Sequence, residues 1–177
     1  MAASPLPSVP IRSDILLDAN IFIYALLEQS GQCRELLTRC AREEIFAVTT
    51  FDAVIEATHR LMVAEGFGRG LIPKGTRNPA KWLKKRPEAV QEMSTYWAQV
   101  QSILDLNVLL LRTGEDSLRR AQEVRSAYGL LTRDSLLVAA MREYGLTSIA
   151  SNDSDFDRVH ELTRYQPADL VAPAPST

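Results

Sequence analysis

Four carboxylates in this chain occupy positions at which a metal-dependent reaction would need them. An unbroken apolar run stops abruptly at Asp18, and a second, shorter run ends just before Asp153. Glu56 is expected about one turn into a helix that follows a strand, and Asp134 opens another helix. If these four groups met in one cleft, they would repel one another unless a cation neutralised them. Carboxylate oxygens favour hard ions, so the sequence predicts a site for Mg²⁺ or Mn²⁺.

Each of these acids also has an ordinary structural role. Asp18 and Asp134 suit the N-termini of the helices that follow them. Glu56 can pair with Arg60 one helical turn later, and Asp153 can close an Asx turn. Taken one residue at a time, the sequence leaves both interpretations open.

Alternating strands and helices are predicted to bring the acids together. Hydrophobic periodicity predicts strands over 15–17, 45–48, 106–111 and 147–150, and helices over about 20–27, 33–41, 51–62, 80–85, 93–104, 116–128 and 134–144. The expected apolar side of helix 51–62 is made of Phe51, Val54, Ile55, Thr58, Leu61 and Met62. This alternation is typical of a three-layer α/β/α sandwich with a mainly parallel sheet. In such a sheet the strand-to-helix junctions share one edge, where α/β folds build their sites.

The length and composition indicate one domain. The chain has 177 residues, and we predict a single domain over residues 14–166. Residues 1–13 contain three prolines and no apolar core of a signal peptide, so we expect a flexible arm. Residues 167–177 also contain three prolines and are expected to be disordered. The longest apolar run has seven residues, against about 18 for a membrane span, so we expect a cytoplasmic protein without membrane contact.

One segment differs sharply in charge from the rest of the chain. Residues 66–87 contain seven basic residues and no acid, whereas the remainder has a net charge of −9. The seven are Arg69, Lys74, Arg77, Lys81, Lys84, Lys85 and Arg86. We predict a basic insertion over about 66–90 that contacts a polyanion, with a solvated loop as the alternative. Its glycines and prolines indicate an irregular segment that is mobile when free.

Three stretches of the sequence together resemble the PIN-domain family, most closely the VapC-type toxin ribonucleases of toxin–antitoxin systems. They are LLDANIFIYALL, TTFDAVIEATHRL and RDSLLVAAMREYGLTSIASNDSDFDRV, of which the last is the most specific. The resemblance covers about residues 15–159. It implies that Asp18, Glu56, Asp134 and Asp153 bind a divalent metal and cut RNA.

The same resemblance implies several further roles. Asp155 would add a ligand oxygen or support the ligands, and Asn20 and Ser151 would orient the acids. The implied partners are an RNA substrate, a small antitoxin protein and a second copy of the chain in a homodimer. The seven basic residues of the insertion would then contact the phosphates of the RNA. Helices carrying Phe22 or Trp97 are candidate surfaces for such contacts.

The expected function is therefore that of an Mg²⁺-dependent endoribonuclease, the toxin of a type II toxin–antitoxin pair, which hydrolyses RNA with metal-activated water. One alternative is a non-catalytic module on the same fold that binds RNA or a protein partner. Another is a DNA-directed, structure-specific nuclease. Retention of all four acids weighs against the first alternative. The small size and the absence of a DNA-binding appendage weigh against the second.

Overall fold

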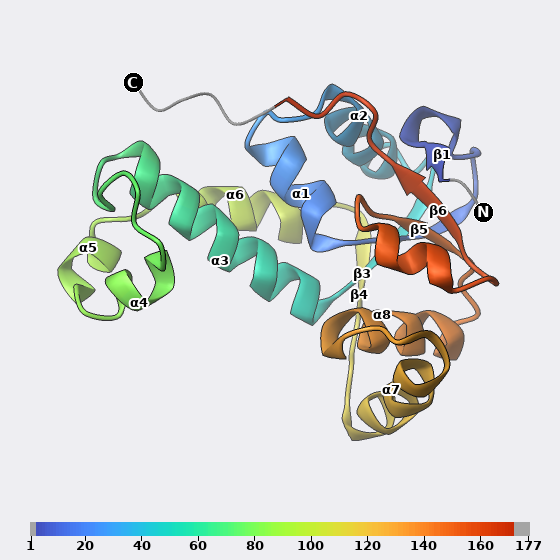
Figure 1. Cartoon of the computed structure of the whole chain (residues 1–177). Helices are drawn as coiled ribbons and strands as arrows, with labels where there is room; N and C mark the ends of the chain where they lie inside the picture. The colour runs from blue at the N-terminus through green and yellow to red at the C-terminus, as the bar shows by residue number, and fades with distance from the viewer. Residues whose placement is uncertain (1–2, 172–177) are drawn as a thin grey trace.

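A parallel sheet lies at the centre of the computed structural model, which describes residues 3–171 (Figure 1). Six strands are present in this part of the chain, in the spatial order β1-β6-β5-β2-β3-β4, and every neighbouring pair is parallel. They are β1 (Ser4–Pro5), β2 (Asp14–Leu17), β3 (Phe46–Thr50), β4 (Val108–Leu111), β5 (Ser148–Ala150) and β6 (Thr163–Gln166). The four predicted strands correspond to β2 to β5, and the sequence analysis missed the two short strands at one edge.

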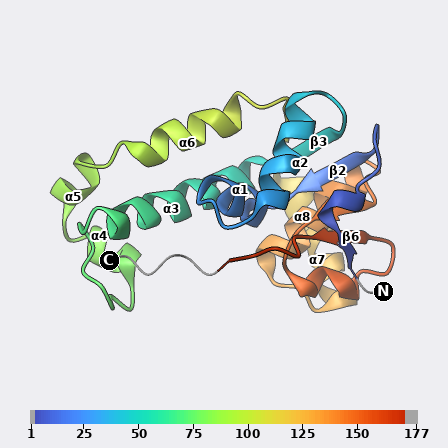
Figure 2. The same cartoon turned by 90° about the horizontal axis from the view of Figure 1, so that it is seen from above.

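Helices cover both faces of this sheet. They are α1 (Ala19–Leu26), α2 (Gly31–Ala41), α3 (Phe51–Gly68), α4 (Pro79–Leu83), α5 (Pro87–Gln91), α6 (Thr95–Leu104), α7 (Glu115–Tyr128) and α8 (Thr132–Glu143). α7 and α8 lie on one face, and α1, α2, α3 and α6 lie on the other (Figures 1 and 2). Successive residues of β2 alternate between the two cores, since Ile15 and Leu17 join one and Leu16 the other. The predicted three-layer α/β/α sandwich is confirmed. None of the helices between residues 3 and 171 is both long and apolar enough to span a membrane.

The order of the strands creates a switch point beside β2. From β2 the chain moves to β3 and β4 on one side of the sheet, and it later returns to β5 and β6 on the other side. Leu17, the last residue of β2, is in register with Ala150, the last residue of β5. Loops that leave such a point in opposite directions open a crevice at the carboxyl ends of the strands. The residues that follow β2 and β5 therefore lie side by side.

α3 is longer than predicted and is rotated about its axis. It continues to Gly68 instead of ending near residue 62. Phe51 and Ile55, expected on its inner side, are 56% and 53% exposed, while Ala57 and Leu61 are fully buried. Val54 and Leu61 are buried as predicted, so the buried stripe of α3 also includes Ala57 and leaves Phe51 and Ile55 outside it.

The basic segment forms a folded lobe at the far end of α3 (Figure 1). We call residues 69–93 the basic lobe; it contains α4 and α5. Ile72, Leu83, Ala89 and Met93 form its own small core. The predicted short helix near 80–85 corresponds to α4, but the expectation of an irregular segment is wrong, because this core holds the lobe against α3.

Both ends of the described chain are held against the body of the protein. Ser4 in β1 is in register with Tyr165 of β6, and Leu6 is 1% exposed. Asp169 accepts hydrogen bonds from Ser30 Oγ (2.5 Å) and from the Gln32 backbone N–H (3.0 Å). These contacts correct the prediction of a flexible arm for residues 3–13 and of a disordered tail for residues 167–171. Residues 1–2 and 172–177 lie outside the described part.

Candidate metal centre and active site

Asp18 lies directly after β2, at the switch point of the sheet. Its Oδ1 accepts the backbone N–H of Ala19 (2.7 Å), so it does serve as the N-cap of α1. Its Oδ2 accepts hydrogen bonds from Asn20 Nδ2 (2.5 Å) and Ser151 Oγ (2.6 Å). Burial raises the pKa of Asp18 to about 6, against these hydrogen bonds, and the carboxylates of Glu56 and Asp134 raise it further. The helix cap and the acidic site are therefore two roles of one side chain.

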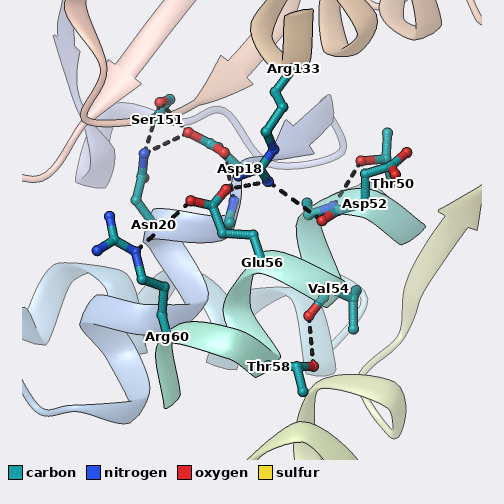
Figure 3. A network of polar contacts seen from close by, with 12 residues as sticks. Asp18, Asn20, Thr50, Asp52, Val54, Glu56, Thr58, Arg60, Arg133 and Ser151 are labelled. Atoms are coloured by element: carbon teal, nitrogen blue, oxygen red, sulfur yellow. Dashed lines mark hydrogen bonds and ion pairs between the residues drawn. The ribbon is translucent and has the colours of Figure 1, made fainter. Parts of the chain in front are cut away.

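The turn after β5 fixes the second acid next to the first. Ser151 is fully buried, and its Oγ accepts the backbone N–H of Asp153 (3.0 Å). Asn20 bridges the two loops, since its Nδ2 donates to Ser151 Oγ (3.1 Å) and its Oδ1 accepts the N–H of Asn152 (3.2 Å). Asn20 and Ser151 thus connect the loops after β2 and β5 and both lie beside Asp18 (Figure 3).

Three carboxylates form a compact cluster beside this bridge. Asp134 comes from the first turn of α8, and Asp153 and Asp155 come from the loop after β5. One oxygen from each lies within 4.8 Å of the others. Asp153 also accepts the N–H of Asp155 (2.9 Å), which is the predicted local turn. Burial raises the pKa of Asp134, and so do the neighbouring Asp153 and Asp155, while Arg133 opposes them. Such a set of hard oxygen ligands fits a divalent cation of the Mg²⁺ class.

Glu56 is held differently from the other acids. Its Oε2 forms an ion pair with Arg133, and its Oε1 lies 4.0 Å from Arg60 Nε (Figure 3). Arg133 also approaches the backbone oxygen of Asp52 (3.5 Å). The sequence analysis did not identify Arg133, and its only signal there is that it precedes Asp134. Glu56 consequently contributes to the field at Asp18 but belongs to an arginine pair, outside the three-carboxylate cluster.

These groups line one open cleft of about 1220 Å³. Asp18, Glu56, Asp134 and Asp153 all contribute to its wall, so the structure brings the four predicted acids together. Burial is the main cause of the raised pKa values of Asp18 and Asp134, and repulsion from the neighbouring carboxylates adds to the rise. Neutralisation by a cation would relieve this repulsion.

The seven predicted RNA-binding residues lie away from this cleft, on the basic lobe. Arg69 is committed to the lobe itself, because its guanidinium pairs with Glu65 (3.1 Å) and contacts the backbone oxygen of Glu92. The Arg86 guanidinium stacks on the Trp82 ring, 4.2 Å from its centroid. The others are exposed lysines and Arg77, arranged around α4: Lys74, Arg77, Lys81, Lys84 and Lys85.

This chain is similar in sequence and in fold to known proteins. The model of the PIN domain matches residues 15–162. Ribonuclease VapC6 of Methanocaldococcus jannaschii is 25% identical over 157 residues, covering 83% of this chain and 93% of that protein. The fold is similar to VapBC2 of Rickettsia felis, solved with a promoter DNA fragment (TM-score 0.57, 13% identity, 86% of this chain and 98% of that one). It is also similar to VapC20 of Mycobacterium tuberculosis, a toxin that cleaves the sarcin–ricin loop (TM-score 0.51, 14% identity, 82% and 94%).

Proposed function

Because the chain belongs to the PIN domain family, we propose that it is a divalent-metal-dependent endoribonuclease and the toxin of a type II toxin–antitoxin pair. The observation that carries this proposal is the meeting of Asp18, Asp134 and Asp153 in one cleft at the switch point. An RNA strand is itself anionic, so acids that repel one another suit hydrolysis with a cation better than simple binding. The relative named as a ribonuclease supports the same reaction class.

Asp134, Asp153 and Asp155 are the residues that would hold the ion, with Asp18 on the wall of the same cleft. When bound, Mg²⁺ or Mn²⁺ supplies a water of lowered pKa and neutralises charge on the scissile phosphate. Asn20 and Ser151 keep Asp18 Oδ2 in place through their hydrogen bonds. Ligand-orienting groups of this kind commonly change metal affinity or activity by about 10–100-fold when removed.

Glu56 is proposed to accept the proton of the attacking water, and Arg133 to fix its carboxylate through their ion pair. No side-chain nucleophile is needed, because water attacks the phosphorus and the 3′ oxygen leaves. Exposed cations of the basic lobe would position the strand through its phosphates without specifying the sequence. Single-stranded regions of structured RNA are the proposed substrate class, since their bases can be splayed out.

Two partners and a location complete the proposal. The similar structure from Rickettsia felis is that of a VapBC pair, which supports a small antitoxin as partner. Trp97 is 50% exposed on α6 and offers apolar surface for a homodimer, whereas Phe22, the other candidate, is wholly buried. The reaction is proposed to take place in the cytoplasm. A monomer in light scattering at micromolar concentration would contradict the dimer.

The nuclease proposal is tested with the purified protein and a structured RNA. We expect internal cleavage in Mg²⁺ or Mn²⁺, none in EDTA, and none for Asp134→Asn, which removes a central carboxylate of the cluster. Asp105→Asn is the matched control, because Asp105 is exposed at the end of α6 and away from the cleft. Cleavage that persists in EDTA, or that favours DNA of the same sequence, would overturn the proposal.

A further inference from the structure

The cleft extends well beyond the acids, and this extension has a different chemical character. Along α1 it is lined by Ile23, Tyr24 and Leu27, and along α3 by Val63, Ala64 and Phe67. All six side chains are partly exposed. Most of them pack on a core beneath, so they form firm walls with accessible apolar faces. Two aromatic rings, Tyr24 and Phe67, are among them.

The length and charge of this extension suit a nucleic acid strand. From Glu56 to Phe67 the helix rises by about 16 Å, which has room for several stacked nucleotides at about 3.4 Å each. Between Glu56 and Gly68, where the cleft ends, α3 contributes no acid to its wall and one cation, Arg60. Gly68 is followed directly by the basic lobe (Figure 1). The electrostatic field thus becomes favourable to phosphates along the path that leads away from the acids.

We propose that this apolar extension is a binding site for the bases of single-stranded RNA next to the scissile phosphate. The inference rests on the proposed function, because it requires a strand whose phosphate lies at the acids. The backbone would then run toward the basic lobe, with unpaired bases against Tyr24, Val63 and Phe67. Stacking on aromatic rings tolerates every base, so the site selects unpaired strands over duplex without reading a particular sequence.

The test compares a short fluorescent oligouridylate with a chain of abasic ribose phosphates of equal length. Anisotropy titrations use the Asp18→Asn protein in Mg²⁺, so that the probe is not cut. We expect the base-bearing probe to bind about tenfold more tightly or better, from the usual strength of base–aromatic stacking. In that background Ala64→Trp, which fills the extension, should remove this advantage and leave the affinity for the abasic probe unchanged.

Matched variants separate blocking of the site from damage to the fold. Ala127→Trp places the same side chain on an exposed position of α7, and it should change neither affinity. Tyr24→Leu keeps apolar volume but removes a ring, and it should lower only the affinity for the base-bearing probe. Equal binding of both probes, or equal effects of Ala64→Trp and Ala127→Trp, would overturn the base site.

The outcome for the base site is independent of the outcome for the nuclease. If wild-type protein cleaves RNA in Mg²⁺ but both probes bind equally, the nuclease proposal stands and the base site fails. If the probes are distinguished but wild-type protein cuts no RNA, the base site stands and the nuclease proposal fails.

Discussion

Two carboxylates, Asp18 at the start of α1 and Glu65 near the end of α3, show how one chemical group is used in two ways. Asp18, in the acidic cleft, has a pKa raised to about 6. Glu65, beneath the basic lobe, has a side chain that is 4% exposed, yet its pKa is lowered to about 2. Burial raises the pKa of both groups, so the difference comes from their partners.

Glu65 has a complete set of donors. Its carboxylate accepts the backbone N–H groups of Ser94 (3.0 Å) and Tyr96 (2.8 Å) at the start of α6, and it pairs with Arg69. Ser94 caps this helix with no side-chain hydrogen bond of its own, so Glu65 supplies the cap from α3. Asp18 has neutral donors and faces other acids. Glu65, which supports the fold, is neutralised within the chain, whereas Asp18, in the candidate site, has no cation among its hydrogen-bond partners.

The largest effect that would test this contrast is on activity. Asp18→Asn should reduce RNA cleavage to background, because Asp18 lies at the centre of the candidate site. The same change should stabilise the metal-free protein by about 2 kcal/mol at pH 7, since it removes a charge that burial disfavours. Urea unfolding and a cleavage assay measure the two effects. Asp14→Asn, at an exposed position of β2, is the control and should change neither.

The sign of the pH dependence follows from the raised pKa of Asp18. Below about pH 4 the carboxyl is protonated in both states, and it costs the fold nothing. As the pH rises from about 4 through the folded-state pKa of about 6, the free energy of unfolding of the metal-free protein should fall, because the unfolded state loses the Asp18 proton more readily than the folded state. A wild-type protein that is more stable than Asp18→Asn at pH 7 without metal would contradict the account.

The next effect concerns the other carboxylate and has the opposite sign. Glu65→Gln should destabilise the protein by about 3 kcal/mol at neutral pH, because the lowered pKa contributes stability above the ordinary value. This contribution should disappear as the pH falls from about 4.5 toward 2, so wild type and variant should converge in acid. Glu123→Gln, on an exposed face of α7, should behave as wild type. Equal stabilities at pH 7 would show that Glu65 does not cap α6.

Two glycines near the end of α3 test how tightly the basic lobe packs on this helix. A Cβ at Gly66 would lie 2.6 Å from Ile72 Cδ1 and 3.0 Å from Met93 Cε, in the core of the lobe. A Cβ at Gly68 would meet nothing within 4 Å. Gly66→Ala should therefore be less stable than Gly68→Ala by about 2 kcal/mol, since alanine otherwise favours the helix at both positions. Thermal unfolding measures the difference, and the reverse order would mean that the lobe does not pack tightly on α3.

The smallest expected effect is on salt dependence. Neutralising Lys81, Lys84 and Lys85 together as glutamines should lower the logarithmic salt slope of RNA binding by roughly 0.7 per lysine for single strands. Mn²⁺ binding should not change, because these exposed side chains lie outside the acidic cleft. The control removes three exposed cations elsewhere, Arg34, Arg42 and Arg119. Equal slopes for the two triple variants would leave the lobe without a role in RNA binding.

Local sequence determined most of the architecture. The unbroken apolar run before Asp18 predicted a strand buried on both faces, and β2 does divide its residues between two cores. The acids after β2 and β5 were expected at one edge because parallel strands place their carboxyl ends together. β1 was missed because it has only two residues, and β6 because its residues Thr163–Gln166 contain no apolar run. The helical periodicity of α3 was recognised, but not which residues face inward.

Tertiary structure alone decided how the charges are shared. The sequence placed Glu56 among four equivalent acids, but Arg133, 77 positions away in the chain, pairs with it, and Asp155 completes the carboxylate cluster instead. Glycines and prolines made the basic lobe look irregular, yet Ile72 and Met93 pack it on α3. Periodicity and turn chemistry act between neighbours in the chain, so they fix the elements and the junctions. The partner of a buried charge depends on which helices the sheet brings together. A local sequence pattern does not indicate how far apart two such helices lie, so it cannot predict the pairing.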